Sequence, residues 1–310
     1  MPIGGFHGGG ANIVRNKEEI MPKPKKQFAK IYTEITNVCN LNCSFCHGTS
    51  RERGFLSALD FALFAKKIAP YTDHVYLHVM GEPLLHPELE KIIDNAAREG
   101  LSVSITTNGT LLKKRLPLLL NKASKLYKIS ISLHSFEANA DVNTENYLDE
   151  CIEAAKALGE AGVISVLRLW NIEGLSETAP QNTQNGYILD RLKEYFTGEW
   201  QENRSGQKIG KSVYLEWGER FDWPDMNAKN YGEHGFCYAM KDHIAVLCDG
   251  SVIPCCLDAD GIMTLGNLKE AELGEILESE KAKLIAHGFA HNTLVHPLCR
   301  HCGFARKFSV

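Results

Sequence analysis

The chain has 310 residues, of which 44% are hydrophobic and 23% are charged, which allows one large domain with a small appendage. Its formal net charge of −4 excludes a general polyanion binder, because phosphate contacts need a basic surface, so no nucleic-acid partner is expected. No apolar run approaches the ~20 residues of a membrane span, and the N-terminus lacks the order of a signal peptide. We therefore expect a cytoplasmic protein without a membrane partner, and in that reducing compartment its ten cysteines point to metal binding or catalysis.

In chain order, a glycine-rich and flexible tail is expected over residues 1–28, followed by apolar, β-branched runs that alternate with amphipathic stretches. The runs predict strands at 30–36, 74–79, 102–106, 128–133, 163–170 and 211–217. The stretches between them predict helices at 58–69, 86–99, 111–124, 146–161 and 187–196. Such alternation implies parallel βαβ units, and six units are too few for a closed eight-fold barrel. The predicted α/β fold is a partial (β/α)6 TIM-like barrel over residues 29–222, with its chemistry at the C-terminal ends of the strands.

The amino-acid composition changes after this barrel, where glycine, cysteine and proline become more frequent. Runs at 244–248 and 252–255 flank Asp249-Gly250, which predicts a hairpin, and residues 273–287 predict a helix. Residues 223–310 are therefore expected to form a small cysteine-rich α+β domain.

A first group of cysteines directly follows the first predicted strand. Cys39, Cys43 and Cys46 have the spacing C-x3-C-x2-C. Three thiolates in one short loop can hold one face of an iron–sulfur cubane and leave one iron open to another molecule. Zinc is the alternative, with His47 as a fourth ligand.

The segment CNLNCSFC resembles the signature of the radical S-adenosylmethionine (SAM) superfamily. The resemblance implies that the three cysteines bind a [4Fe–4S] cluster whose open iron holds the amino and carboxylate groups of SAM. An electron from the cluster then splits SAM into methionine and a 5′-deoxyadenosyl radical. The resemblance also places Phe45 near the adenine.

Smaller motifs after later strands support the same resemblance. Val79-Met-Gly-Glu-Pro83 resembles the Gly-Gly-Glu-Pro motif of the family, with Met80 in place of the first glycine, and Thr106-Thr-Asn-Gly109 matches its common TTNG turn. Ordinary turn chemistry is the alternative reading of each motif. A guanidinium suits bidentate binding of a carboxylate, which adds an arginine of the fifth strand. The residues expected to bind SAM are thus Phe45, Gly81, Glu82, Thr107, Asn108, Ser132 and Arg168.

A second group, Cys237, Cys255, Cys299 and Cys302, has enough thiolates to close a cluster, although a four-cysteine zinc site is an equal alternative on ligand chemistry. The order of these cysteines, with Gly250-x4-Cys255 and the later CxxC, resembles the auxiliary domains called SPASM and twitch. The resemblance implies one auxiliary [4Fe–4S] cluster. Cys256 is the alternative to Cys255 as its ligand.

The implied chemistry is abstraction of hydrogen from an unactivated carbon, followed by oxidation or by return of a hydrogen atom. Oxidation needs a base, for which Glu216, Glu219 and Asp222 are candidates, whereas Cys248 or Cys256 could donate hydrogen. An electron donor such as flavodoxin or ferredoxin would be a partner.

The leading functional hypothesis is oxidative modification, or maturation, of a peptide or protein. A small-molecule dehydrogenase or epimerase is one alternative, and a non-enzymatic zinc-binding module is another.

Overall fold

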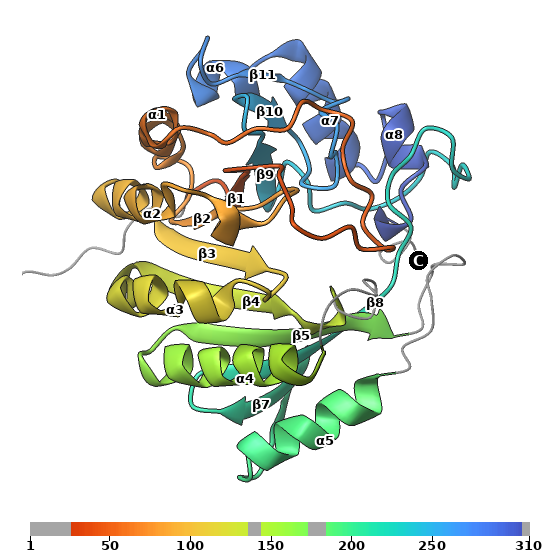
Figure 1. Cartoon of the computed structure of the whole chain (residues 1–310). Helices are drawn as coiled ribbons and strands as arrows, with labels where there is room; N and C mark the ends of the chain where they lie inside the picture. The colour runs from red at the N-terminus through yellow and green to blue at the C-terminus, as the bar shows by residue number, and fades with distance from the viewer. Residues whose placement is uncertain (1–25, 136–143, 173–183, 306–310) are drawn as a thin grey trace, which may run out of the picture.

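The computed structural model describes residues 26–135, 144–172 and 184–305, and Figure 1 shows a single twisted sheet with helices packed along it. The sheet has eleven strands in the order β11-β10-β9-β1-β2-β3-β4-β5-β8-β7-β6. Its six central strands are mutually parallel neighbours, which confirms the predicted partial (β/α)6 barrel. These strands are β1 (Lys30–Thr33), β2 (His74–Tyr76), β3 (Ser102–Thr107), β4 (Leu126–Ser132), β5 (Ile164–Ile172) and β8 (Val213–Glu219).

Helices cover one face of these strands because their apolar residues recur at helical spacing. In the second helix Leu89, Ile92, Ile93 and Ala96 are fully buried on one side, and in the first the Ser57 side chain caps the N-terminus by accepting from Asp60 N. The helices of this layer are α1 (Ala58–Ile68), α2 (Leu89–Arg98), α3 (Leu112–Asn121), α4 (Thr144–Glu160) and α5 (Asn185–Tyr195).

The opposite face of the six parallel strands is here called the inner face. Side chains alternate along a strand, so Ile31 and Val75 pack into the hydrophobic core beneath the helices while Tyr32 and Tyr76 point the other way. The inner face is where polar side chains of the strands gather, and it carries most of the chemistry described below.

Three strands from the C-terminal part of the chain extend the same sheet. They are β9 (His243–Val246), β10 (Ser251–Ile253) and β11 (Gly266–Asn267), and β9 pairs in parallel with β1. The antiparallel β9–β10 hairpin, with Gly250 at φ +98°, confirms the prediction from Asp249-Gly250. Strands from both sides of residue 222 belong to one sheet, so the sheet topology does not mark a domain boundary. The predicted boundary between residues 222 and 223 stays a prediction.

Other elements differ from expectation. The helix predicted over 273–287 is wrong, since the chain forms α6 (Leu273–Leu277) and α7 (Glu280–Ala290), and Ser279 caps the second by accepting from Ala282 N. An antiparallel hairpin of β6 (Gln201–Asn203) and β7 (Gly206–Gly210) was not predicted. A short helix α8 (Pro297–Arg300) lies near the C-terminus.

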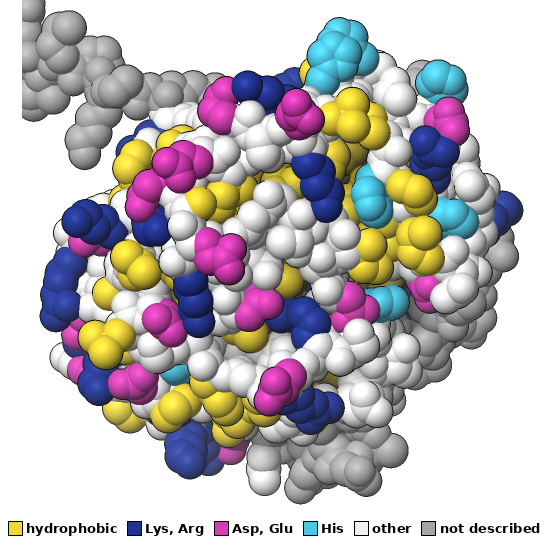
Figure 2. All heavy atoms as spheres, turned by 90° about the horizontal axis from the view of Figure 1, so that it is seen from above, with side chains coloured by type: hydrophobic (Ala, Val, Ile, Leu, Met, Phe, Trp, Pro, Cys, Tyr) yellow, Lys and Arg dark blue, Asp and Glu magenta, His cyan; other side chains and the backbone are white. Residues whose placement is uncertain are grey.

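Two further expectations concern the surface and the tail. Of the helices in the described part of the chain, none is long and apolar enough to cross a membrane. Figure 2 shows acidic and basic side chains interspersed on the face that it views, without a broad field of positive charge. Most of the tail predicted over residues 1–28 lies outside the described residues.

Candidate functional site

The first cysteine group lies in the loop that leaves the carboxyl end of β1. The amide of Cys46 donates to the carbonyl of Cys43 at 3.0 Å, which closes a turn around the thiols. Burial raises the pKa of Cys39 and that of Cys46. The next cysteine in the sequence, Cys151, is buried within α4. Three thiols supplied by one loop fit the donor set of a cubane that keeps one iron open.

The turns that follow β2 and β3 hold this loop in place. The buried carboxylate of Glu82 accepts from Leu84 N at 2.9 Å and from Asn108 N at 2.7 Å, while Glu82 N donates to the carbonyl of Val38. Burial raises the pKa of Glu82 to about 7 against the opposing effect of these hydrogen bonds. The side-chain nitrogen Nδ2 of Asn108 lies 3.8 Å from the sulfur of Cys39. Both side chains therefore position the cysteine loop, and their direct binding of SAM stays a prediction.

Gly81 and Thr107 also have local structural reasons to be present. Gly81 has φ +77°, and a Cβ there would lie 2.4 Å from the carbonyl oxygen of Thr36. The glycine thus lets this turn pack against the backbone just before the cysteine loop. The hydroxyl of Thr107 accepts from Gly109 N at 3.1 Å and so shapes the turn after β3. Their predicted contact with SAM is not tested by these contacts.

The remaining residues predicted to bind SAM fall at two places. The ring of Phe45 lies 4.8 Å from that of His134 at the carboxyl end of β4, close to the cysteine loop. Ser132 and Arg168 are register partners on β4 and β5. The guanidinium of Arg168 stacks 4.2 Å from the Trp170 ring, and its Nε lies 3.7 Å from the carboxylate of Glu216. Arg168 therefore belongs to the inner face.

A buried ion pair that sequence reasoning missed joins the cysteine loop to the rest of the protein. The fully buried carboxylate of Glu34 accepts from Arg51 Nη2 at 2.7 Å, from Met80 N at 3.1 Å and from Cys248 N at 3.2 Å. We call these four residues the Glu34 network. Arg51 Nε also donates to the carbonyl of Ala259. A carboxylate inside the first predicted strand was the available signal, because a buried charge needs a partner.

Further contacts attach the cysteine loop to the C-terminal elements. Asp260 accepts from the hydroxyl of Thr49 at 2.7 Å and from Ser50 N at 2.7 Å. Trp223 Nε1 donates to the carbonyl of Phe45 at 3.1 Å, and its ring stacks 6.1 Å from that of His47. These contacts hold the loop between the sheet and the C-terminal elements, and the tryptophan covers one side of it.

The second cysteine group surrounds one small cavity. Cys237, Cys255, Cys299 and Cys302 all line it, together with apolar side chains such as Met263 and Phe289. Burial raises the pKa of Cys237 and of Cys302 to about 12, and raises that of Cys299 further. The amides of Ala239 and Leu257 each donate to a cysteine sulfur at 3.4 Å. Four converging thiols with amide donors in an apolar setting fit a closed iron–sulfur cluster or a zinc ion.

Only one of the two adjacent cysteines that follow β10 lines this cavity. Cys255 lines it, whereas Cys256 packs with Ala245, Leu247 and Tyr32 on the inner face. The ligand atoms of His243, Cys255 and Cys256 lie within 4.8 Å of one another. This arrangement favours Cys255 as the ligand, and the choice stays a prediction.

The candidate proton acceptors and hydrogen-atom donors lie at different depths. Glu216 is on the inner face beside Arg168, whereas Glu219 is exposed. Asp222 accepts through its backbone carbonyl from Gly303 N, near the end of the described chain. The sulfur of Cys248 is 3.8 Å from Arg51 within the Glu34 network, and burial raises the pKa of this thiol to about 11. Of the three candidate carboxylates, Glu216 is the one that the register places on the inner face, beside Arg168, and it is partly buried.

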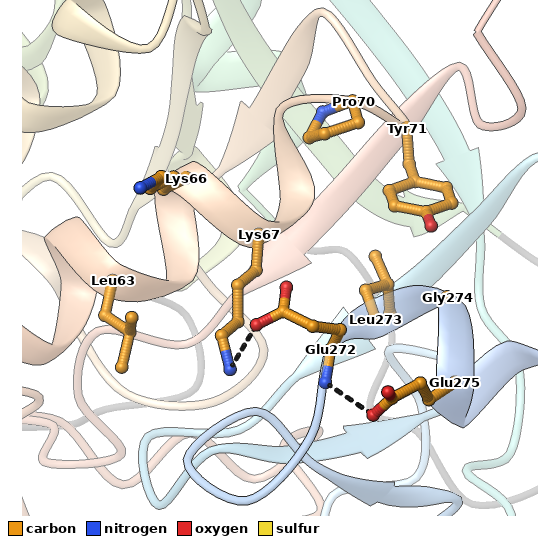
Figure 3. A pocket seen from close by; sticks show the side chains of 9 residues that line it. All are labelled: Leu63, Lys66, Lys67, Pro70, Tyr71, Glu272, Leu273, Gly274 and Glu275. Carbon is orange, nitrogen blue, oxygen red and sulfur yellow. Dashed lines mark hydrogen bonds and ion pairs between the residues drawn. The ribbon is translucent and has the colours of Figure 1, made fainter.

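A surface hollow between α1 and α6 lies away from all the cysteines (Figure 3). Its centre is Lys67, whose Nζ donates to the carbonyls of Leu268 and Ala271 and pairs with Glu272 at 3.1 Å. The ammonium group is fully engaged in holding α6 to α1. The hollow is therefore a structural junction.

Comparison with known protein families identifies both cysteine regions. A model of the radical SAM superfamily matches residues 33–184, and a model of the iron–sulfur cluster-binding domain SPASM matches residues 237–303. Each match spans one of the two cysteine groups.

Curated relatives match less than half of the chain. The GTP 3′,8-cyclase of Aquifex aeolicus is 33% identical over 156 residues, which are 45% of this chain and 48% of that protein. A probable GTP 3′,8-cyclase of Pyrobaculum aerophilum is 32% identical over 119 residues, which are 37% of this chain and 38% of that protein. The chain thus spans less than half the length of these relatives.

Solved structures share the fold over most of the chain. BtrN in complex with AdoMet and 2-DOIA has a TM-score of 0.57 and 18% identity, with 90% of this chain and 94% of that chain covered. Streptococcus suis SuiB bound to the precursor peptide SuiA has a TM-score of 0.57 and 15% identity, with 89% and 71% covered. Native anSMEcpe with AdoMet and Cp18Cys peptide has a TM-score of 0.56 and 14% identity, with 88% of each covered.

Proposed function

The chain belongs to the radical SAM superfamily and carries a SPASM iron–sulfur domain, and from this premise we propose that it oxidises a small polar molecule bound on the inner face of the sheet. The chain is an enzyme, which makes the non-enzymatic zinc-binding alternative wrong. Its cofactors are a [4Fe–4S] cluster that binds SAM and an auxiliary iron–sulfur cluster. We assign Cys39, Cys43 and Cys46 to the first cluster and Cys237, Cys255, Cys299 and Cys302 to the second.

The observation that carries this proposal is the placement of the inner face between the two cysteine groups. The first group leaves the carboxyl end of β1, while β10 returns antiparallel to β9 and brings Cys255 beside His243 at the amino end of β9. Since His243 pairs with Lys30 at the amino end of β1, the two groups lie at opposite ends of one strand pair. A substrate on the inner face near Tyr32 would be flanked by both.

The bound cofactors supply a 5′-deoxyadenosyl radical that abstracts hydrogen from the substrate, and an iron–sulfur centre able to accept an electron. The protein must orient the substrate and accept a proton, since loss of a hydrogen atom, a proton and an electron completes a two-electron oxidation. Glu216 is the carboxylate best placed for that proton, because it lies on the inner face and Arg168 holds it there at 3.7 Å. Trp223 fixes the loop at Phe45 through its hydrogen bond to the Phe45 carbonyl.

A peptide or protein substrate is the second candidate function, and it was the leading hypothesis from the sequence. Its support is that SuiB and anSMEcpe were solved with peptides and share the fold. The small-molecule proposal is favoured by the polar and charged inner face, and the relatives named GTP 3′,8-cyclase agree with it. Epimerisation would need a hydrogen donor, for which Cys256 lies beside Tyr32 on that face.

The test begins with anaerobic reconstitution of the full chain. We expect about eight irons per chain, as two four-iron clusters, and release of 5′-deoxyadenosine on addition of SAM and dithionite, with flavodoxin or ferredoxin as the proposed natural donor. A Cys39→Ala/Cys43→Ala/Cys46→Ala variant should keep about four irons per chain and release no 5′-deoxyadenosine. Deuterium transfer into 5′-deoxyadenosine from deuterated sugars or nucleotides supports the small-molecule proposal. Transfer from deuterated peptides alone would replace it with the peptide function.

A further inference from the structure

The inner face has a composition that its fold does not require. In closed barrels of this type, branched apolar side chains fill the interior. Here Tyr32, Tyr76, Ser104 and Lys128 lie at one level across four neighbouring strands, as the strand registers show. Lys30 lies one inward position below them, and His78, Arg168 and Glu216 lie above. Polar and charged side chains on an interior face are expected where they bind a polar ligand.

Positive charge is in excess on this face. Lys30 pairs with Asp242 at 3.1 Å, and Arg168 has Glu216 at 3.7 Å. Lys128 has no hydrogen bond or ion pair within the described residues, and its Nζ lies 5.5 Å from the centroid of the Tyr76 ring. The carboxylate of Glu34 is committed to Arg51. Among the described residues, the three cations Lys30, Lys128 and Arg168 thus have two carboxylates as partners, Asp242 and Glu216.

The cations converge on the same few side chains. The Nζ of Lys30 lies 5.8 Å from the Tyr76 ring, on which Lys128 also acts, and Tyr32 lies 5.3 Å from the rings of both Tyr76 and His78. Burial lowers the pKa of His78 to about 3, and the charges of Arg168, Lys128 and Lys30 lower it in the same direction. His78 is therefore neutral, and one of its ring nitrogens can donate a hydrogen bond.

Three of these polar groups have a buried atom without a hydrogen bond. Arg168 Nε, His78 Nδ1 and Ser104 Oγ make no hydrogen bond within the described part of the chain, although Arg168 Nε has the ion pair with Glu216. Buried polar atoms are bonded in the great majority of cases, because an unbonded one carries the full cost of lost hydration. The guanidinium of Arg168, which has a long ion pair with Glu216, and the neutral imidazole of His78 can both donate to one anionic group, and the ammonium of Lys128 adds positive charge on the same face.

We propose that the inner face binds an anionic group of the substrate, a phosphate or a carboxylate, through Arg168 and Lys128, with His78 as a neutral hydrogen-bonding neighbour. A guanidinium binds either anion through two parallel N–H donors, and an ammonium adds a point charge. The assignment rests on the proposed function for the identity of the ligand as the substrate. It moves Arg168 from the carboxylate of SAM to the substrate.

The experiment measures anion binding by the full, anaerobically reconstituted holoenzyme with isothermal titration calorimetry. Pyrophosphate is the phosphate probe and citrate is the carboxylate probe, each at low ionic strength. We expect saturable binding of at least one probe, weakened about tenfold or more in Lys128→Gln and largely restored in Lys128→Arg. Lys156→Gln is the control, because Lys156 is an exposed residue of α4, and it should bind as the wild type does.

Each contrary outcome overturns the anion site. The first is that the wild type shows no saturable binding of either probe, and the second is that Lys128→Gln binds the probe as tightly as the wild type does. The third is that Lys128→Arg unfolds thermally like the wild type but does not restore anion binding. The fourth is that saturating SAM competes with the probe. The last would mean that the probe occupies the site of the SAM carboxylate. Binding needs no cleavage of SAM, so a wild type that binds anions but releases no 5′-deoxyadenosine would overturn the proposed function alone.

Discussion

Replacing Arg51 with methionine removes the guanidinium that faces the buried carboxylate of Glu34. The side chain of Glu34 is 0% exposed and that of Arg51 is 14% exposed, so water cannot readily take the place of the lost partner. Burial opposes the charge on Arg51, but the hydrogen bond and charge of Glu34 outweigh it and raise the pKa of Arg51. The guanidinium of Arg51 is therefore charged in the folded protein.

The expected loss of stability follows from what remains around Glu34. Breaking a buried ion pair by removing one partner costs about 3–5 kcal/mol. In the variant the carboxylate keeps the amides of Met80 and Cys248 as donors, and these partly satisfy the charge. We therefore expect the free energy of unfolding to fall by about 3 kcal/mol, at the lower end of that range.

Anaerobic urea unfolding followed by tryptophan fluorescence measures this change. The double variant Glu34→Gln/Arg51→Met buries no charge, so it should lose less stability than Arg51→Met alone. Lys91→Met removes an exposed partner of Glu88 and is the matched control, with no measurable loss expected. A loss below about 1 kcal/mol in Arg51→Met, or a greater loss in the double variant, would refute the assignment of a buried ion pair.

Three further predictions concern single residues. Gly81→Ala should lower the free energy of unfolding by more than about 2 kcal/mol in urea, since its φ of +77° is strained for alanine and the new Cβ would meet the carbonyl of Thr36 at 2.4 Å; wild-type stability would contradict the close approach. Cys255→Ser should lose about four irons per chain by iron analysis, whereas Cys256→Ser should keep them all; the reverse result would make Cys256 the ligand. Burial lowers the pKa of His134 to about 4, so its contribution to stability is fully present above about pH 6.5 and is lost as the pH falls toward 4, at up to about 1.4 kcal/mol per pH unit. Urea midpoints between pH 5 and 7 should show this slope in the wild type and a shallower one in His134→Gln, and equal slopes would rule out a neutral histidine.

The parts of the fold that the sequence predicts are those with strong local signals. The six parallel strands were found because each is a short β-branched run between helices of regular apolar spacing. The β9–β10 hairpin was found through Asp249-Gly250, whose glycine has the positive φ that its turn needs. The β6–β7 hairpin was missed because Gln201–Asn203 is fully exposed and shows no alternation of apolar residues.

Pairings that connect distant segments were beyond local reasoning. Because more than 200 residues separate β1 from β9, no local pattern near Lys30 or His243 indicates that the two strands are neighbours. The site shows the same limit. The cysteine spacings predicted both groups, but the partnership of Glu34 with Arg51 depends on how a loop folds back over the strand. Likewise, Glu82 and Asn108 were assigned to the cofactor on motif grounds, while the structure reveals their hydrogen bond to each other.

The β1–β9 pairing has a consequence for how the two cysteine groups work together. The four register pairs from Lys30–His243 to Thr33–Val246 fix these strands side by side, as Figure 1 shows for β1 and β9. At about 3.3 Å per residue, the levels of Cys255 and of the carboxyl end of β1 differ by about 10 Å along the sheet, and the cysteine loop extends beyond that end. The Glu34 network then ties that loop to Cys248 at the carboxyl end of β9. The spacing between the groups is thus set by rigid backbone pairing, so a substrate anchored near Tyr32 keeps a constant relation to both.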